Sequence, residues 1–155
     1  MYNGYKCAVN HDGRLTEKIA TNVGVRQGCL LSPILFLILL EKVLKNMNRR
    51  RRRGIQWGLT GRLEDLEYAD DLCLLAHRLS DIQGLVRDLG NAGEREGLVI
   101  NQSKSFEMRV NAPRPTPLML CGVPIAQADQ ITYLGSVVSG DGGSDLDVQA
   151  RINKA

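Results

Sequence analysis

Two adjacent carboxylates, Asp70 and Asp71, are the residues of this sequence best suited to chemistry. Apolar residues flank the pair, with Leu66, Tyr68 and Ala69 before it and residues 72–76 after it. Two apolar arms around a polar turn predict a β-hairpin with both aspartates at its tip. Because adjacent carboxylates repel each other, holding both at the turn of a buried hairpin is unfavourable unless a cation neutralises them.

Mg²⁺ is the cation that this arrangement favours, since it binds a few carboxylates and completes its coordination with water and phosphate oxygens. That is the chemistry of two-metal phosphoryl transfer. The simpler alternative is a plain turn, because Asp hydrogen-bonds its own backbone there and tolerates left-handed geometry. The aspartate pair alone leaves both interpretations open.

The composition is that of an ordinary globular chain of about one domain. Of its 155 residues, 43% are hydrophobic and 24% are charged, and the net charge of +3 is compatible with nucleic-acid binding without indicating it. The four cysteines are widely spaced without a CxxC pair, and there are two histidines. This pattern argues against a zinc site or a disulfide framework and fits an intracellular setting.

The most apolar run, residues 29–40, is interrupted by Ser32-Pro33 and is shorter than the ~18 apolar residues that a membrane span needs. The N-terminus also lacks the charged and apolar regions of a secretory signal. We therefore expect neither secretion nor a membrane span. Ser32 as N-cap and Pro33 as first residue instead predict a helix to about Asn48, apolar all round in its first turns and hence buried.

The remaining patterns predict a mixture of helices and strands, that is, an α+β chain. Asp12-Gly13 predicts the turn of a hairpin over residues 5–23. Ser80 and Gln83 form the pattern of a capping box at the start of an amphipathic helix that ends at Gly97. Further predicted elements are strands at 98–101 and 105–110, a short hairpin around residue 122, a strand at 131–138 and a last helix after Ser144.

Two further segments have polar or charged residues with more than one interpretation. The block Arg49–Arg53 comes directly after a helix, where we favour a solvated loop over a phosphate contact or a nuclear-localisation patch. Asp141, Asp145 and Asp147 allow a calcium site, but the glycine and glutamate of an EF-hand loop do not match. The start of a helix explains these acids better.

Four blocks, taken in order, resemble the reverse transcriptase domain of non-LTR, LINE-like retrotransposons. GVRQGCLLSPILF looks like motif B of that family, LEDLEYADDLCLLAH like motif C, GLVINQSKS like motif D and ITYLGSVVSGDG like motif E. The resemblance covers nearly the whole chain, and four motifs in the right order make it specific.

The resemblance implies the partial palm of a right-hand polymerase, an antiparallel sheet backed by helices, running into the start of the thumb. It divides the chain into residues 1–128, the partial palm with motifs B, C and D, and residues 129–155, a primer-grip-like hairpin and the start of a thumb helix. Asp70 and Asp71 match the metal-binding aspartates of motif C. Lys104 matches the motif D lysine, a candidate proton donor to the leaving pyrophosphate.

The other matched positions imply contacts with nucleic acid and nucleotide. Tyr68 and Ala69 match positions beside the primer end. Gln27 and Gly28 match the motif B loop at the incoming nucleotide and the template, where a glycine also allows close backbone approach. Tyr133, Leu134 and Gly135 match the primer grip.

The implied reaction is attack by a DNA primer 3′-hydroxyl on the α-phosphate of a dNTP, templated by RNA and assisted by two Mg²⁺ ions. The family has another aspartate, in motif A, before motif B. Residues 5–23 resemble the family segment between motifs A and B, and they contain no candidate for that aspartate. With the fingers missing too, we expect a truncated copy that is inactive by itself. The alternative function is therefore a catalytically inactive remnant that at most binds nucleic acid.

Overall fold

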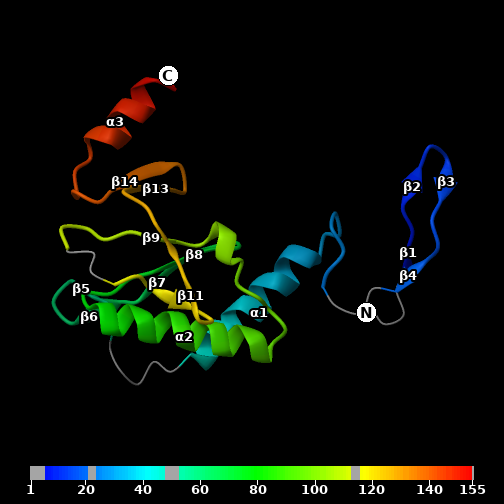
Figure 1. Cartoon of the computed structure of the whole chain (residues 1–155), viewed down its shortest axis with the longest axis horizontal. Helices are drawn as coiled ribbons and strands as arrows, with labels where there is room; N and C mark the ends of the chain where they lie inside the picture. Colours follow the sequence, from blue (N-terminus) through cyan, green and yellow to red (C-terminus); the bar gives the residue numbers. More distant parts are fainter. Residues whose placement is uncertain (1–5, 21–23, 48–52, 113–115, 155) are drawn as a thin grey trace. The chain divides into compact units, whose positions relative to one another are not determined.

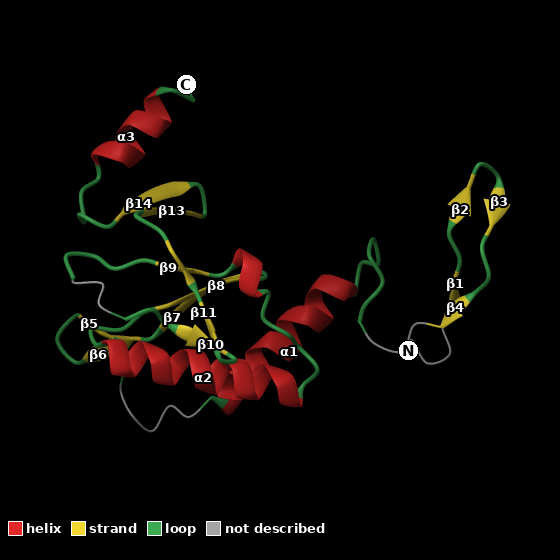
Figure 2. Cartoon of the chain, in the orientation of Figure 1, coloured by secondary structure: helices red, strands yellow, loops and turns green. Residues whose placement is uncertain are grey.

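The computed structural model describes residues 6–20, 24–47, 53–112 and 116–154. The chain divides into two compact units, Met1–Lys42 and Val43–Ala155. Figure 1 labels the helices and strands of both units, and Figure 2 shows how short most of the strands are. Helices and strands alternate along the chain, which confirms the predicted α+β class.

The first unit contains the predicted N-terminal hairpin. Strand β1 (Lys6–Cys7) pairs with β4 (Ile19–Ala20), and β2 (Asn10–His11) pairs with β3 (Arg14–Leu15), all antiparallel. The turn is Asp12-Gly13, with φ of 49° and 77°. Positive φ at both turn positions is the type I′ pattern that Asp-Gly favours, so the turn prediction is confirmed.

Helix α1 (Ser32–Asn46) begins at the predicted residue. The Ser32 hydroxyl donates a hydrogen bond of 2.6 Å back to the carbonyl of Arg26. The predicted burial on every side is wrong, because Ile34 and Ile38 are 55% and 59% exposed. Burial is confined to one stripe at helical spacing, formed by Leu40, Val43, Leu44 and Met47. No helix in the described part of the chain is long and apolar enough to cross a membrane.

The strands of the second unit pair two by two. Antiparallel pairs are β5 (Ile55–Trp57) with β6 (Gly61–Leu63), β7 (Asp65–Tyr68) with β8 (Asp71–Leu74), β10 (Met119–Leu120) with β11 (Val123–Pro124), and β13 (Gln130–Tyr133) with β14 (Ser136–Ser139). Strands β9 (Phe106–Glu107) and β12 (Ala126–Gln127) pair in parallel. The described strands therefore form separate two-stranded sheets and not the antiparallel sheet that the resemblance implied.

Helix α2 (Leu79–Arg95) packs against β10 and β8 (Figure 2). Its Leu85 is fully buried, and Leu118 and Leu120 on and beside β10 are also in the core. The amphipathic spacing predicted this helix, and Gly97, with φ of 77°, ends it as expected.

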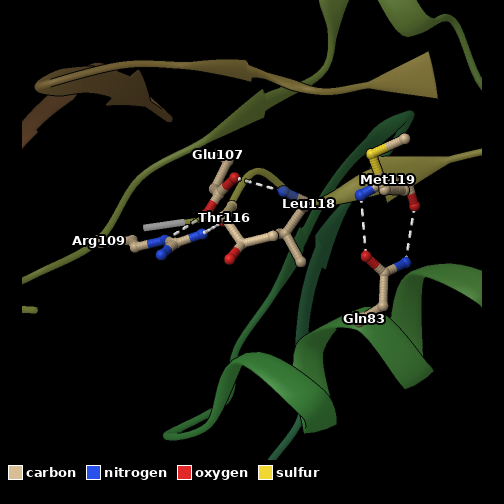
Figure 3. Close-up of polar contacts among 6 residues, drawn as sticks. All are labelled: Gln83, Glu107, Arg109, Thr116, Leu118 and Met119. Atoms are coloured by element: carbon tan, nitrogen blue, oxygen red, sulfur yellow. Dashed lines mark hydrogen bonds and ion pairs between the residues drawn. The ribbon is translucent and has the colours of Figure 1, made fainter. Parts of the chain in front are cut away.

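The predicted capping box at the start of α2 is wrong. Arg78 occupies the N-cap position, where no side chain caps the helix. The amide of Gln83 instead donates 2.7 Å to the carbonyl of Met119 and accepts 2.8 Å from its N–H (Figure 3). The Gln83 side chain thereby satisfies both backbone groups of Met119, as a paired strand would, and holds α2 against β10.

A second polar group connects β9 to the segment before β10 (Figure 3). The buried carboxylate of Glu107 accepts a 2.9 Å hydrogen bond from the N–H of Leu118 and forms an ion pair with Arg109. Arg109 also donates to the carbonyl of Thr116. These contacts replace the longer strand predicted over residues 105–110.

The predicted strand at 98–101 is also wrong. Asn101 caps a 3₁₀ helix, η1 (Gln102–Lys104), by accepting a 3.1 Å hydrogen bond from the N–H of Ser103. Asn side chains compete in this way with strand pairing, because they offer the backbone a local partner. The last helix, α3 (Asp145–Ile152), begins directly after Ser144 as predicted.

Replacing Gln83 with Ala is expected to lower the free energy of unfolding by about 1–2 kcal/mol, since two hydrogen bonds to the Met119 backbone are lost. Urea unfolding followed by circular dichroism measures the change. Gln149→Ala is the matched control, because the Gln149 amide donates to the side chain of Asn153 one turn along α3. Equal effects of the two substitutions would contradict a specific role of Gln83.

Candidate active site

The two adjacent aspartates lie at the tip of the β7–β8 hairpin, as predicted. Tyr68 pairs with Asp71 across the strands, and Ala69-Asp70 forms the two-residue turn. One further backbone hydrogen bond of 2.8 Å, from the N–H of Leu75 to the carbonyl of Glu64, extends the hairpin at its base. The sequence pattern therefore located both the strands and the turn.

The tip of this hairpin is exposed, which differs from the predicted buried hairpin. Asp70 and Asp71 are both exposed, Tyr68 is 64% exposed, and Leu66 is 40% exposed. Water screens the repulsion between two exposed carboxylates, so burial alone does not demand a cation here. In the described residues neither side chain forms a hydrogen bond or an ion pair, which leaves both carboxylates available to a ligand.

The turn itself is strained at Ala69, whose φ is 54°. A left-handed conformation costs a residue with a Cβ about 1–2 kcal/mol. Such strain at a turn that carries functional groups is a known property of binding and catalytic sites.

Replacing Ala69 with Gly is expected to raise the stability of the protein by up to about 1 kcal/mol, because the relief of strain exceeds the added freedom of the unfolded chain. Thermal unfolding would test this. Ala150→Gly in helix α3 is the control, and there a loss of about 1 kcal/mol is expected. A loss at position 69 as large as that at position 150 would contradict the strained turn.

The base of the hairpin is fixed by Arg53, the last residue of the arginine block. Arg53 is 6% exposed, its Nη2 lies 2.6 Å from Oδ2 of Asp88, and its backbone N–H donates 2.9 Å to Oε1 of Glu64. A Cβ at position 84 would lie 2.5 Å from Nη1 of Arg53, so Gly84 makes room for it. The solvated loop that we favoured is wrong for Arg53, while residues 49–52 lie outside the described part.

Tyr133 approaches the same hairpin from β13. Its hydroxyl donates a 3.3 Å hydrogen bond to the carbonyl of Leu66. Burial raises the pKa of Tyr133, and electrostatic interaction with Cys73, Asp71 and Glu67 raises this pKa further. The structure thus brings Tyr133 close to the aspartate turn.

The predicted nucleotide-loop residues belong to the first unit. The N–H of Cys29 donates 3.3 Å to the carbonyl of Arg26, which closes a turn with Gln27 and Gly28 at its centre. Gly28 has φ of 79°, so the turn requires glycine there, and Gln27 is exposed at the corner.

Lys104 and the remaining primer-grip residues lie in the second unit. Lys104 is exposed at the end of η1. Leu134 and Gly135 form the two-residue turn between β13 and β14, with φ of 50° and 83°. The single strand predicted at 131–138 is thus a hairpin, since a turn at Leu134-Gly135 divides it.

The C-terminal acids act as local hydrogen-bond acceptors. Asp141 accepts a hydrogen bond from the hydroxyl of Ser139 and one of 2.9 Å from the N–H of Gly143, and these bonds lower its pKa. Asp147 accepts from Arg151 and from the N–H of Val137, which lowers its pKa likewise. In the described residues no three His, Cys, Asp or Glu side chains are arranged to hold a metal ion.

Sequence reasoning missed two long-range contacts of the site. The Arg53–Asp88 ion pair joins residues 35 positions apart, and the Tyr133–Leu66 hydrogen bond joins residues 67 apart. Gly84 was the one available signal, because a glycine in the middle of an amphipathic helix is unfavourable unless something packs closely against it.

Comparison with known proteins agrees with the resemblance. Residues 2–138 match the family described as reverse transcriptase (RNA-dependent DNA polymerase). The chain is 28% identical, over 84% of its length, to a Pol polyprotein of the retrotransposable element R2 from Popillia japonica, and 29% identical, over 87%, to that of R2DM from Drosophila melanogaster. It spans 23% and 12% of these relatives. The chain belongs to the reverse transcriptase family, and its relatives place it with the reverse transcriptase domains of non-LTR retrotransposons.

Proposed function

We propose that this chain is part of an RNA-directed DNA polymerase in which Asp70 and Asp71 bind Mg²⁺ and nucleotides are transferred from dNTPs to a primer 3′-hydroxyl. The observation that carries this proposal is the placement of two adjacent, exposed carboxylates on the tip of one hairpin in a reverse transcriptase chain. The partners implied by the family are an RNA template, a DNA primer and a dNTP.

The donor set fits a hard divalent cation. Carboxylate oxygens are the protein ligands that Mg²⁺ prefers, and they take only part of its coordination. Bound there, two Mg²⁺ ions would lower the pKa of the primer hydroxyl and stabilise the charge on the leaving pyrophosphate. In the family three aspartates hold the ions, and by the resemblance Asp70 and Asp71 are two of them.

The other matched residues would position the substrates. Tyr68 is exposed beside Asp71 and can contact the end of a primer. Ala69 forms the turn and presents only a methyl group there. Lys104, with an exposed ammonium group, would donate a proton to the leaving pyrophosphate and add positive charge near it.

The remaining positions would contact the nucleotide, template and primer strands. The exposed amide of Gln27 can both donate and accept hydrogen bonds, and Gly28 lets the backbone approach closely. Leu134 and Gly135 form an exposed turn suited to the primer grip. We further propose that residues 1–128 are the palm part of this polymerase, and residues 129–155 the primer-grip hairpin and the first thumb helix.

Primer extension tests the proposal directly. The purified chain is incubated with a DNA primer annealed to an RNA template, the four dNTPs and Mg²⁺. Incorporation that disappears in Asp70→Asn supports the polymerase. Retention of the primer–template duplex in a filter-binding assay, without incorporation in any Mg²⁺ or Mn²⁺ concentration, would instead support an inactive remnant that binds nucleic acid.

A further inference from the structure

The starting observation is a contact between two hairpins that are far apart in sequence. The Tyr133 hydroxyl donates to the carbonyl of Leu66, two residues before Tyr68 on β7. Leu66 is paired with Cys73, and the next pair on the same face of the hairpin is Tyr68 with Asp71. Tyr133 therefore contacts the strand two pairs before the Tyr68–Asp71 pair that flanks the turn.

The tyrosine is suited to a permanent donor role. It is half-buried, and its raised pKa keeps the hydroxyl protonated at neutral pH. Burial is the main cause of the raised pKa, and electrostatic interaction with Cys73, Asp71 and Glu67 on the β7–β8 hairpin raises the pKa further. A phenol held in this way donates to a backbone carbonyl and leaves the carboxylates free.

The hairpin that carries Tyr133 is itself anchored. The N–H of Val137 on β14 donates 2.8 Å to Oδ1 of Asp147, and Nη2 of Arg151 donates 2.7 Å to the hydroxyl of Ser136. Arg151 and Asp147 also pair with each other at 2.8 Å within α3. Helix α3 thus fixes β13 and β14, and Tyr133 connects this assembly to β7.

We infer that Tyr133 is a positioning residue that holds the Asp70–Asp71 hairpin in place, so that within Tyr133-Leu134-Gly135 only the turn is left to face a primer. Leu134 is 53% exposed, and it lies in the turn between β13 and β14, outside the paired residues of the two strands. Its φ of 50° is a strained backbone conformation. The expected effect on metal and primer binding rests on the proposed function. The contact between Tyr133 and Leu66 does not depend on any metal.

Hydrogen exchange of the metal-free protein tests the inference. Tyr133→Phe removes only the hydroxyl, and the amides of residues 64–75 are expected to exchange about 2–10-fold faster, the fold-change that corresponds to one hydrogen bond. Amides of α2 around the buried Leu85 are expected to be unaffected. Thr132→Val is the matched control, since it removes an exposed hydroxyl from the same strand that makes no hydrogen bond with the described residues.

A second measurement connects the contact to the site. Mn²⁺, used in place of Mg²⁺, is titrated by electron paramagnetic resonance, and Tyr133→Phe is expected to weaken its binding about 2–5-fold, within the effect of one lost hydrogen bond. Thr132→Val, which changes an exposed neighbour of Tyr133 on β13, is expected to leave this binding unchanged.

The outcomes separate this inference from the proposed function. Unchanged exchange of residues 64–75 in Tyr133→Phe would overturn the positioning role, and so would equal acceleration in the hairpin and α2, which indicates general packing. No Mn²⁺ binding by the unsubstituted protein would contradict the proposed function, while faster exchange confined to the hairpin would still support the contact.

Discussion

Replacing Asp70 or Asp71 with Asn is expected to abolish Mn²⁺ binding at the hairpin and to lower any primer extension by about 10²–10³-fold or more. The substitution keeps the size of the side chain and removes the negative charge that a divalent cation requires. An electrostatic group that stabilises the charge developing in a transition state has an effect of this magnitude. Electron paramagnetic resonance measures the Mn²⁺ affinity, and extension of a labelled primer on RNA measures the reaction.

Glu67→Gln is the matched control for this experiment. Glu67 is an exposed acid on the same hairpin, but it pairs with Leu72 and so points to the face opposite Asp71. Its neutralisation changes the net charge equally and is expected to alter Mn²⁺ affinity less than about threefold, as screening of an exposed charge implies. If Glu67→Gln and Asp71→Asn weakened binding alike, general charge and not a defined site would explain the effect.

Replacing Arg53 with Met is expected to destabilise the protein by about 3–5 kcal/mol, because Asp88 is left as a largely buried carboxylate without its cation. The Arg53 and Asp88 side chains are 7% and 15% exposed, so solvent screens their attraction little. Chemical unfolding in urea, followed by circular dichroism, gives the change in the free energy of unfolding.

Arg87→Gln is the control for Arg53. Arg87 neighbours the same carboxylate at 3.8 Å, but its side chain is 71% exposed, and a change below about 1 kcal/mol is expected. The double substitution Arg53→Met with Asp88→Leu is expected to recover part of the lost stability, since no charge is then left buried. A loss in Arg53→Met no larger than in Arg87→Gln would refute the structural role of this ion pair.

The sequence was most informative where local patterns decide the structure. Asp12-Gly13 specifies a turn by itself, and the apolar spacing from Ile82 to Ala92 specifies the buried face of α2. The apolar residues on both sides of Asp70 and Asp71 likewise predicted the hairpin. These features depend on residues a few positions apart, so no knowledge of the remaining chain is needed.

The errors arise where distant residues decide. Gln83 satisfies the pattern of a capping box, but the backbone of Met119 offers its amide two partners at once. Residues 98–101 look like a strand, yet no described strand pairs with them, and Asn101 caps η1 instead. The parallel pairing of β9 with β12 has no local signal, because partner choice depends on the fold.

For the candidate site, the sequence indicated which residue types are present but not their exposure or their distant contacts. Adjacent aspartates indicated a metal site, whereas their exposure at the tip is evident only in the structure. Arg53 belongs to a run of five arginines, and composition cannot distinguish the one that is buried. Its partner Asp88 lies on a helix whose register had to be known first.

The close approach of Arg53 to Gly84 limits which substitutions are acceptable at these two positions during evolution. A methyl group at position 84 would lie 2.5 Å from Nη1 of Arg53, so the guanidinium would have to shift from its place beside Asp88. Homologous copies that acquire a larger residue on the helix are expected to have lost the arginine, with a compensating neutral residue in place of Asp88. An alignment of homologous sequences is therefore expected to show correlated substitutions at positions 53, 84 and 88.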